Sequence, residues 1–230
     1  MFRKETYGKV LAPMVTPFKK DQSVDYDGAV EIAKRLIRDN KADSLILTGT
    51  TGEFFSMNFE ERVNIFKNIK KEVGNKISLI AGTGCASTKE TIELSKKAEE
   101  LGFETIMVVA PYYTKPNQEQ LYNHYKLLAE EVSVNIMLYN IPIFTGVNLS
   151  PEIVSKLAMI DNIVAIKDEA ELNVKQITEF INVTPDDFII YNGDDTMIIE
   201  TYAQGGKDRI GGVVSGQAHL IGERIRKMIN

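Results

Sequence analysis

The chain has 230 residues, of which 43% are hydrophobic and 26% are charged, a composition typical of one globular domain with a sizeable core. The formal net charge of −5 argues against nucleic acid or an acidic membrane surface as a partner. The single cysteine, Cys85, excludes an intrachain disulfide and fits a reducing cytoplasm. Met1–Glu5 is followed by no apolar signal segment, and no apolar run approaches the ~18 residues of a membrane span. We therefore expect a cytoplasmic protein without a membrane partner.

Short apolar runs rich in β-branched residues recur along the whole chain. Their starts lie roughly 20–35 residues apart, which is the spacing of repeated strand–helix units. The predicted strands are Val10–Val15, Ser44–Thr48, Ile77–Ala81, Thr105–Ala110, Asn135–Tyr139, Ile163–Lys167, Phe188–Tyr191 and Arg209–Val214.

Capping residues mark several of the helices predicted between these strands. Ser87–Glu90 has the pattern of a capping box, and Asn58–Glu61 is a weaker version with asparagine as the cap. Ser150-Pro151 places a cap before a proline at the first helical position. Gly74 and Gly102 are predicted to end their helices in the left-handed conformation.

Eight strand–helix units predict a (β/α)8 TIM barrel that occupies residues 1–230 as a single catalytic domain, with Ala218–Ile229 as the last helix. The alternative is a doubly wound open sheet, which normally carries a glycine-rich phosphate loop after its first strand. Thr16-Pro17-Phe18 follows the first strand here. Gly82-Thr83-Gly84 follows the third strand without the full spacing, so we interpret it as a tight turn.

Lys167 ends the apolar run Ile163–Lys167, which has the character of a buried parallel strand. Lysine is rarely buried without a role, and burial is expected to depress its pKa. The neutral amine could then attack a ketone to form a Schiff base. The structural alternative is a side chain that extends to solvent, and the run alone does not decide between the two.

Other polar residues stand where predicted strands end, and the chemistry of a TIM barrel lies at that face. The turn Gly49-Thr50-Thr51-Gly52 offers two hydroxyls and backbone N–H groups that could hold a carboxylate, although it could also be an ordinary turn. Tyr139 lies one strand from Lys167 and could relay protons, unless its ring only packs inward. Gly193 would let a substrate approach the backbone. Together these groups suit a pyruvate-type 2-oxo acid that becomes an enamine.

The same residues resemble the dihydrodipicolinate synthase / N-acetylneuraminate lyase family of class I aldolases. The resemblance covers essentially the whole chain, with the motifs in family order and spacing. It rests on Gly49-Thr50-Thr51-Gly52-Glu53, Pro111-Tyr112-Tyr113, Tyr139-Asn140-Ile141-Pro142, Ala165-Ile166-Lys167-Asp168 and Gly193-Asp194-Asp195.

The resemblance implies a role for each of the matching residues. By this resemblance, Lys167 forms an imine with pyruvate and Tyr139 shuttles protons. Thr50 and Thr51 bind the pyruvate carboxylate, and Thr51 also joins Tyr139 in a hydroxyl relay that Tyr113 of a neighbouring subunit completes. Gly193 and Val213 line the pyruvate pocket. The resemblance also implies a homo-oligomer, no metal and no organic cofactor. His124 and His219 lack the spacing of a zinc site, which agrees with that expectation.

Phe144 departs from the family pattern, because the synthase branch has at that position an arginine that binds the carboxylate of the aldehyde. This substitution weakens the expectation of aspartate semialdehyde as acceptor and favours a 2-oxo-3-deoxy sugar-acid aldolase. We also expect the side chains around Phe144 and in the segment Glu169–Asn173 to decide acceptor choice.

Two further departures concern regulation and length. Residues at the family's lysine-inhibition site are replaced by Phe54, Phe59, Arg62 and Ala86, which predicts no feedback inhibition by lysine. Relatives continue beyond the position of Asn230 as a helical C-terminal region, so helix faces that the region would cover are expected to be exposed.

The sequence therefore predicts a lyase that joins or cleaves a C–C bond between pyruvate and a small aldehyde through an imine on Lys167. The alternative is a non-catalytic barrel that binds 2-oxo acids, or an inactive shortened relative. Retention of Lys167, Tyr139, Thr50 and Thr51 together favours the enzyme.

Overall fold

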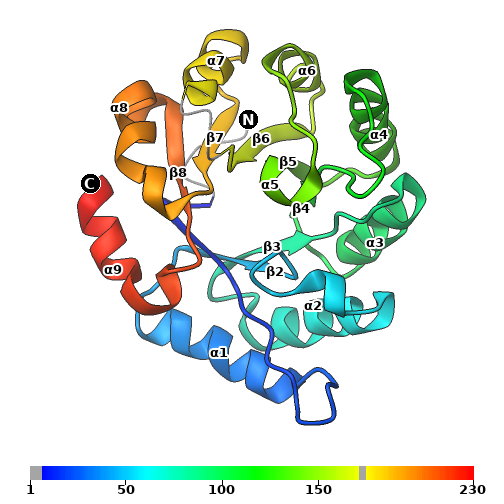
Figure 1. Ribbon diagram of the computed structural model, residues 1–230. Coiled ribbons are helices and arrows are strands. Elements are labelled where there is room, and N and C mark those ends of the chain that lie inside the picture. The colour runs from blue at the N-terminus through cyan, green and yellow to red at the C-terminus, as the bar shows by residue number, and fades with distance from the viewer. Residues whose placement is uncertain (1–6, 171–174) are drawn as a thin grey trace.

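Eight parallel strands close into a barrel in the computed structural model, and helices surround it (Figure 1). The structure describes residues 7–170 and 175–230, without the side chains of residues 206 and 207. Each strand pairs with its neighbours in chain order, and β8 closes the barrel on β1. The strands are β1 Val10–Pro13, β2 Ser44–Leu47, β3 Ser78–Gly82, β4 Thr105–Val109, β5 Asn135–Asn140, β6 Ile163–Asp168, β7 Ile189–Asn192 and β8 Ile210–Val214.

The prediction of a (β/α)8 barrel is confirmed, and each predicted strand overlaps an observed one. The largest difference is at the first strand, which ends at Pro13 rather than Val15. Nearly every strand residue is buried, because the barrel interior covers one face of each strand and the helices cover the other. This two-sided burial explains why the strands appear as continuous apolar runs in the sequence.

Helices follow the strands and form the outer layer. They are α1 Tyr26–Arg38, α2 Phe59–Val73, α3 Thr88–Glu100, α4 Gln118–Glu131, α5 Pro142–Thr145, α6 Pro151–Leu157, α7 Gln176–Val183, α8 Ile198–Arg209 and α9 Ala218–Ile229, with short 3-10 helices η2 Phe54–Ser56 and η3 Asp195–Met197. The predicted last helix is confirmed, and Figure 1 shows α9 between α8 and α1, where it completes the ring.

The helix caps agree with the sequence pattern except in two details. Asn58 makes the full reciprocal capping box with Glu61, whereas the Ser87 side chain accepts from the Glu90 N–H without the return bond to its own N–H. Gly102 takes the predicted left-handed conformation, with φ of +80°. Gly74 does not, because its φ of −63° and ψ of −14° continue the right-handed turn of α2.

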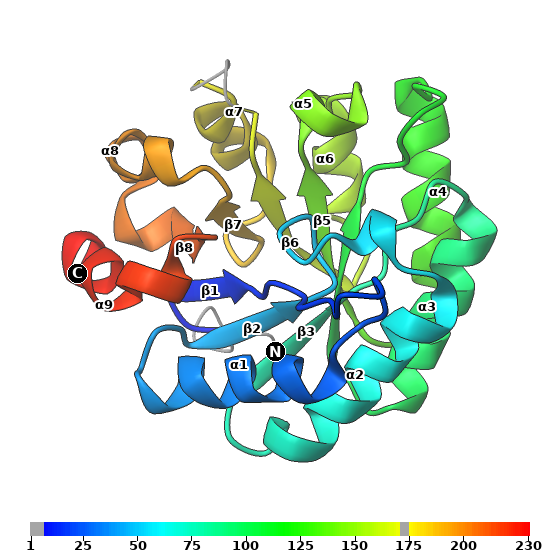
Figure 2. The same ribbon diagram turned by 60° about the horizontal axis from the view of Figure 1, so that its bottom comes forward.

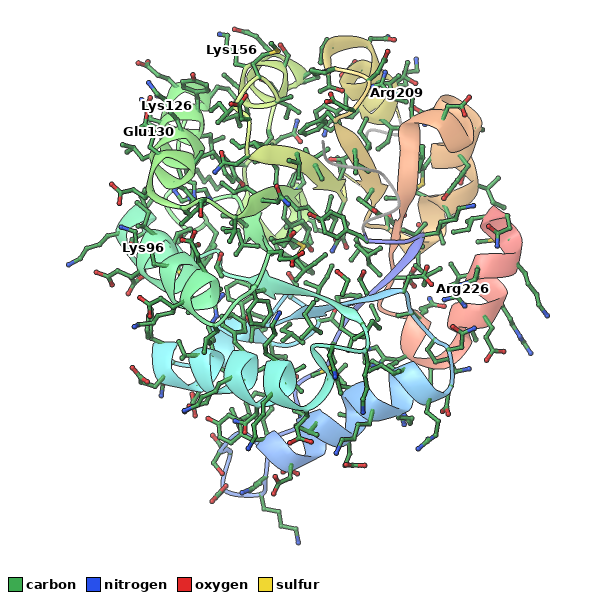
Figure 3. The ribbon with its side chains drawn as sticks, turned by 180° about the vertical axis from the view of Figure 1, so that it is seen from behind. Lys96, Lys126, Glu130, Lys156, Arg209 and Arg226 are labelled. Atoms are coloured by element: carbon green, nitrogen blue, oxygen red, sulfur yellow. The ribbon has the colours of Figure 1, made fainter. Side chains whose placement is uncertain are left out.

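The outer surface of the helix ring is charged, as Figure 3 shows for Lys96, Lys126, Glu130 and Lys156. Ion pairs such as Lys126–Glu130 lie on this surface and contribute little to stability. Apolar side chains also reach solvent there, among them Ile199 of α8 and Leu220 of α9. Among the described residues, no helix combines the length and apolar character that a membrane crossing requires.

Candidate active site

Lys167 and Tyr139 lie side by side at the C-terminal ends of two neighbouring strands. Their Cα atoms are partners in the pairing of β6 with β5. Figure 2 shows α5 beyond the arrowhead of β5, so these residues lie at the face of the barrel that α5 borders. Both residues are buried, and the Lys167 ammonium is 3.9 Å from the centre of the Tyr139 ring. The structure thus brings together the predicted nucleophile and the predicted proton shuttle.

The Lys167 amine is an ion-pair partner of Glu169, with 2.9 Å between Nζ and Oε2. Burial lowers the pKa of Lys167, but Tyr139 and the Glu169 carboxylate raise it by more, so the amine titrates above its usual value. The predicted depressed pKa is therefore wrong for this state of the site. The prediction considered desolvation alone, and the strand pattern did not show that a carboxylate two residues later turns back onto the amine.

Tyr139 connects the lysine to the turn that follows β2. Its hydroxyl donates to Glu169 Oε2 at 2.8 Å. The Thr50 hydroxyl lies 3.4 Å from the same phenolic oxygen, and it is the donor because the phenol's proton points to Glu169. Burial raises the pKa of Tyr139, so its hydroxyl is protonated at neutral pH. Thr50, rather than Thr51 as predicted, makes this contact, and the hydrogen bonds of the described residues include none between Thr51 and Tyr139.

The turn after β2 leaves only part of its backbone free for a ligand. The N–H groups of Gly52 and Glu53 donate to carbonyls within the turn. The N–H groups of Thr50 and Thr51 donate to no protein group in the described part of the chain, so they remain available for a carboxylate. The turn leads into the three-residue η2, which is too short to add a helix dipole to the site.

Gly193 makes room for the lysine side chain. A Cβ atom at this position would lie 2.6 Å from Lys167 Cε, closer than non-bonded carbon atoms approach, so the lysine side chain would have to move. The sequence suggested that Gly193 admits a substrate to the backbone, whereas the structure shows that it first admits the nucleophile itself. Val213 is a buried β8 residue whose Cα partner is Asn192 of β7, next to Gly193.

Tyr113 and Phe144 are exposed at the same face and do not touch the lysine. Tyr113 has 91% of its surface exposed and a strained φ of +79°, and Phe144 of α5 is 66% exposed. The neighbouring Tyr112 is partly buried and meets the Phe54 ring edge-on. Of the predicted acceptor segment Glu169–Asn173, the residues from Glu171 onward lie outside the described part of the chain.

A buried hydrogen-bond network behind Lys167 was not predicted. Asp168 accepts from Asn140 at 2.8 Å and from Gln176 at 3.1 Å, and Asn148 bonds both amides. Adjacent residues of a strand point to opposite faces, so Asp168 faces away from the lysine's side of the strand. The network joins β5, β6 and α7 on both sides of residues 171–174. The only signal in the sequence was an aspartate next to Lys167 in an apolar run.

Burial raises the pKa of Asp168 to about 6, from an ordinary value of 3.8, although its hydrogen bonds oppose the shift. A raised pKa means that the folded state holds this proton more tightly than the unfolded chain. The stability that the protonated group confers is complete below pH 3.8 and is lost as the pH rises through 6. The difference of about two pKa units corresponds to roughly 3 kcal/mol.

Asp168→Asn is therefore expected to remove this pH dependence while retaining an acceptor oxygen for Asn140 and Gln176. Denaturant unfolding of both proteins between pH 4 and pH 8 would show the variant gaining stability relative to the wild type as the pH rises to about 6. A constant difference across this range would contradict the buried titration.

The described residues include no group of three or more His, Cys, Asp or Glu side chains placed to hold a metal ion. The polar groups around Lys167 are a phenol, a carboxylate and a threonine hydroxyl. This arrangement can form an imine with a ketone and move protons at the imine, which is class I aldolase chemistry.

Comparison with known proteins shows the family to which this chain belongs. The profile of the Dihydrodipicolinate synthetase family matches residues 6–230. Among the matching relatives is 4-hydroxy-tetrahydrodipicolinate synthase of Desulforudis audaxviator, 45% identical over 224 residues that cover 97% of this chain and 74% of that protein.

Solved structures agree. Dihydrodipicolinate synthase DapA-2 of Bacillus anthracis superimposes with a TM-score of 0.91 at 39% identity, and the Cyanidioschyzon merolae synthase, solved with lysine bound, with 0.91 at 38%. Each match covers 97% of this chain and 74% of the other. The chain therefore belongs to the dihydrodipicolinate synthetase family and is a lyase of the class I aldolase type.

Proposed function

We propose that residues 1–230 act as one catalytic unit that condenses pyruvate with an aldehyde, or releases it, through an imine on Lys167. The observation that supports this most directly is the buried Lys167 amine beside the Tyr139 ring. No metal or organic cofactor is part of the proposal, because the lysine imine itself withdraws electrons from the reacting carbon. We place the reaction in the cytoplasm, on the single unpaired cysteine and the composition.

The surrounding residues suit the binding of pyruvate. Its carboxylate would accept from the free N–H groups and hydroxyls of Thr50 and Thr51, and Gly193 and Val213 would line the pocket. Tyr139 would then move protons at the imine. Tyr113 is too exposed to serve its own chain, so its role depends on a second copy of the protein, which supports a homo-oligomer.

The acceptor we propose is the aldehyde used by the named relatives, which for a synthase of this kind is aspartate semialdehyde. The relatives share the name 4-hydroxy-tetrahydrodipicolinate synthase, and none of them supports a sugar-acid aldehyde. Phe144 is the one residue that argued for the sugar acid, and its exposed ring favours neither acceptor.

Borohydride trapping with pyruvate, followed by peptide mass spectrometry, tests the proposed function. We expect a reduced pyruvyl adduct on Lys167, and afterwards faster turnover of aspartate semialdehyde than of glyceraldehyde or N-acetylmannosamine. A folded protein that forms no adduct would contradict the proposal. Faster turnover of glyceraldehyde than of aspartate semialdehyde would instead indicate a 2-oxo-3-deoxy sugar-acid aldolase.

L-lysine at millimolar concentration is expected to leave the initial rate unchanged. The Arg62 guanidinium is buried, donates to the carbonyls of Gly82 and Gly84, and lies 5.1 Å from the centre of the Phe54 ring. A second cation placed against this fixed positive charge would be repelled. Rates measured at subsaturating pyruvate with and without lysine check the prediction, and strong inhibition would contradict it.

A further inference from the structure

The Glu169 carboxylate contacts Lys167 and Tyr139, and the proposed imine and pyruvate pocket assign it no role. Its carboxylate oxygen Oε2 lies 2.9 Å from Lys167 Nζ and 2.8 Å from the Tyr139 hydroxyl. One oxygen therefore contacts both the nucleophile and the group expected to shuttle its protons. The side chain is 19% exposed, so it borders the open site and is not sealed in the core.

The backbone fixes Glu169 from both neighbouring strands. Its N–H donates to the Asn140 carbonyl of β5 at 2.9 Å. On the other side, the Gly193 N–H donates to the Asp168 carbonyl, and a Cβ atom added at Gly193 would lie 3.1 Å from the Glu169 Cβ. The contact with Lys167 is therefore built into the end of the barrel and does not depend on an unsupported loop.

Tyr139 cannot accept the first proton from the lysine in this arrangement. Its own proton is donated to Glu169, and burial raises the pKa of its hydroxyl. The ammonium of Lys167 must lose a proton before nitrogen can attack a carbonyl carbon. The Glu169 carboxylate is the acceptor already in hydrogen-bond contact with that proton.

We propose that Glu169 is a catalytic residue that carries protons between Lys167 Nζ and the carbonyl oxygen of the 2-oxo acid during imine formation. The inference rests on the proposed function, because it assigns a role within the same lysine chemistry. Tyr139 holds the carboxylate in place through its hydrogen bond and remains the group nearest to Thr50.

The proton transfers balance in four steps. The ammonium gives a proton to the Glu169 carboxylate, and the neutral amine adds to the ketone carbon while the C=O π pair moves to oxygen. The carboxylic acid protonates that oxygen, and the regenerated carboxylate removes a second proton from nitrogen. The acid then protonates the hydroxyl, which leaves as water as the nitrogen lone pair forms the C=N bond. Glu169 ends as a carboxylate paired with the cationic iminium, so its charge is the same as at the start.

Glu169→Gln distinguishes a proton carrier from a simple ion-pair partner, because the two roles predict opposite changes in the rate of imine formation. If Glu169 only holds Lys167 as an ammonium, its removal lowers the lysine pKa, increases the neutral amine and speeds imine formation. If Glu169 carries the protons, its removal slows imine formation by about 10²-fold or more, the usual scale of general acid–base catalysis. The measurement is the rate of pyruvate adduct formation on Lys167 near neutral pH, by rapid mixing and borohydride quench.

Two comparisons keep the test decisive. Glu131→Gln removes the partner of Lys96 in an exposed ion pair on the outer surface and is expected to leave the rate unchanged. Glu169→Asp keeps a carboxylate and is expected to be faster than Glu169→Gln. Should the glutamine variant fail to fold, Glu169→Asp against Glu169→Asn makes the same comparison.

The outcomes separate the two proposals. An unchanged or faster rate in Glu169→Gln, or a rate in Glu169→Asp no higher than in the amide variant, overturns the role of Glu169 and leaves the Lys167 imine standing. Absence of an adduct in the wild-type protein overturns the proposed function as well.

Discussion

Lys167→Ala is expected to abolish the pyruvate adduct and to lower turnover by at least about 10⁴-fold, the scale that follows removal of a covalent nucleophile. The side chain is buried at the end of β6, and the described residues place no second lysine amine against the Tyr139 ring. Borohydride trapping with peptide mass spectrometry measures the adduct, and a coupled assay with aspartate semialdehyde measures turnover.

Lys156→Ala serves as the matched control, because it removes an exposed lysine that pairs with Glu152 on α6. Its activity and adduct should equal those of the wild type. Circular dichroism of Lys167→Ala should remain native, since the space left beside Gly193 opens to the site and can hydrate Glu169. A folded Lys167→Ala protein that retains turnover would show that the imine forms elsewhere or not at all.

Tyr139→Phe is expected to lower kcat by about 10²- to 10⁴-fold while the adduct on Lys167 still forms, more slowly. The change keeps the ring beside the lysine and removes only the hydroxyl. That hydroxyl links the Glu169 carboxylate to Thr50. Steady-state kinetics together with adduct trapping separate a loss of proton transfer from a loss of the nucleophile.

Tyr125→Phe is the control for the structural effect of losing a buried tyrosine hydroxyl. Tyr125 of α4 is fully buried, and its hydroxyl meets backbone groups of Val108 (3.0 Å) and Tyr139 rather than the Tyr139 hydroxyl. Its removal should cost about 1 kcal/mol of unfolding free energy and leave kcat unchanged. Equal losses of kcat in the two variants would indicate that Tyr139 acts only through the fold.

The fold could be predicted because each strand is covered on two sides, so its residues form an unbroken apolar run that periodicity reveals. Strand ends were less certain, since Met14 still donates to the Ile46 carbonyl after β1 has formally ended at Pro13. The pairing of Tyr139 with Lys167 was also accessible, because consecutive strands of a barrel are neighbours and equivalent ends lie at one face.

The ionisation of the site was less predictable, because it depends on which side chains turn toward each other after the strand ends. Nothing in Lys167-Asp168-Glu169 shows that Glu169 folds back onto Lys167 while Asp168 joins Asn140 and Gln176. The choice between Thr50 and Thr51 was similarly hidden. It depends on the left-handed conformations of Thr48 and Glu53 that frame the turn, and the sequence pattern does not report them.

The network around Asp168 has a consequence for how this enzyme could change its substrate over evolutionary time. It anchors the chain at Asp168 on one side of residues 171–174 and at Gln176 on the other, on the face of the strand opposite the nucleophile. Insertions, deletions or substitutions within residues 171–175 can therefore accumulate without displacing Lys167 or Glu169. In an engineering experiment, that stretch could be exchanged for the corresponding stretch of a relative as a cassette while the reactive nitrogen stays in register.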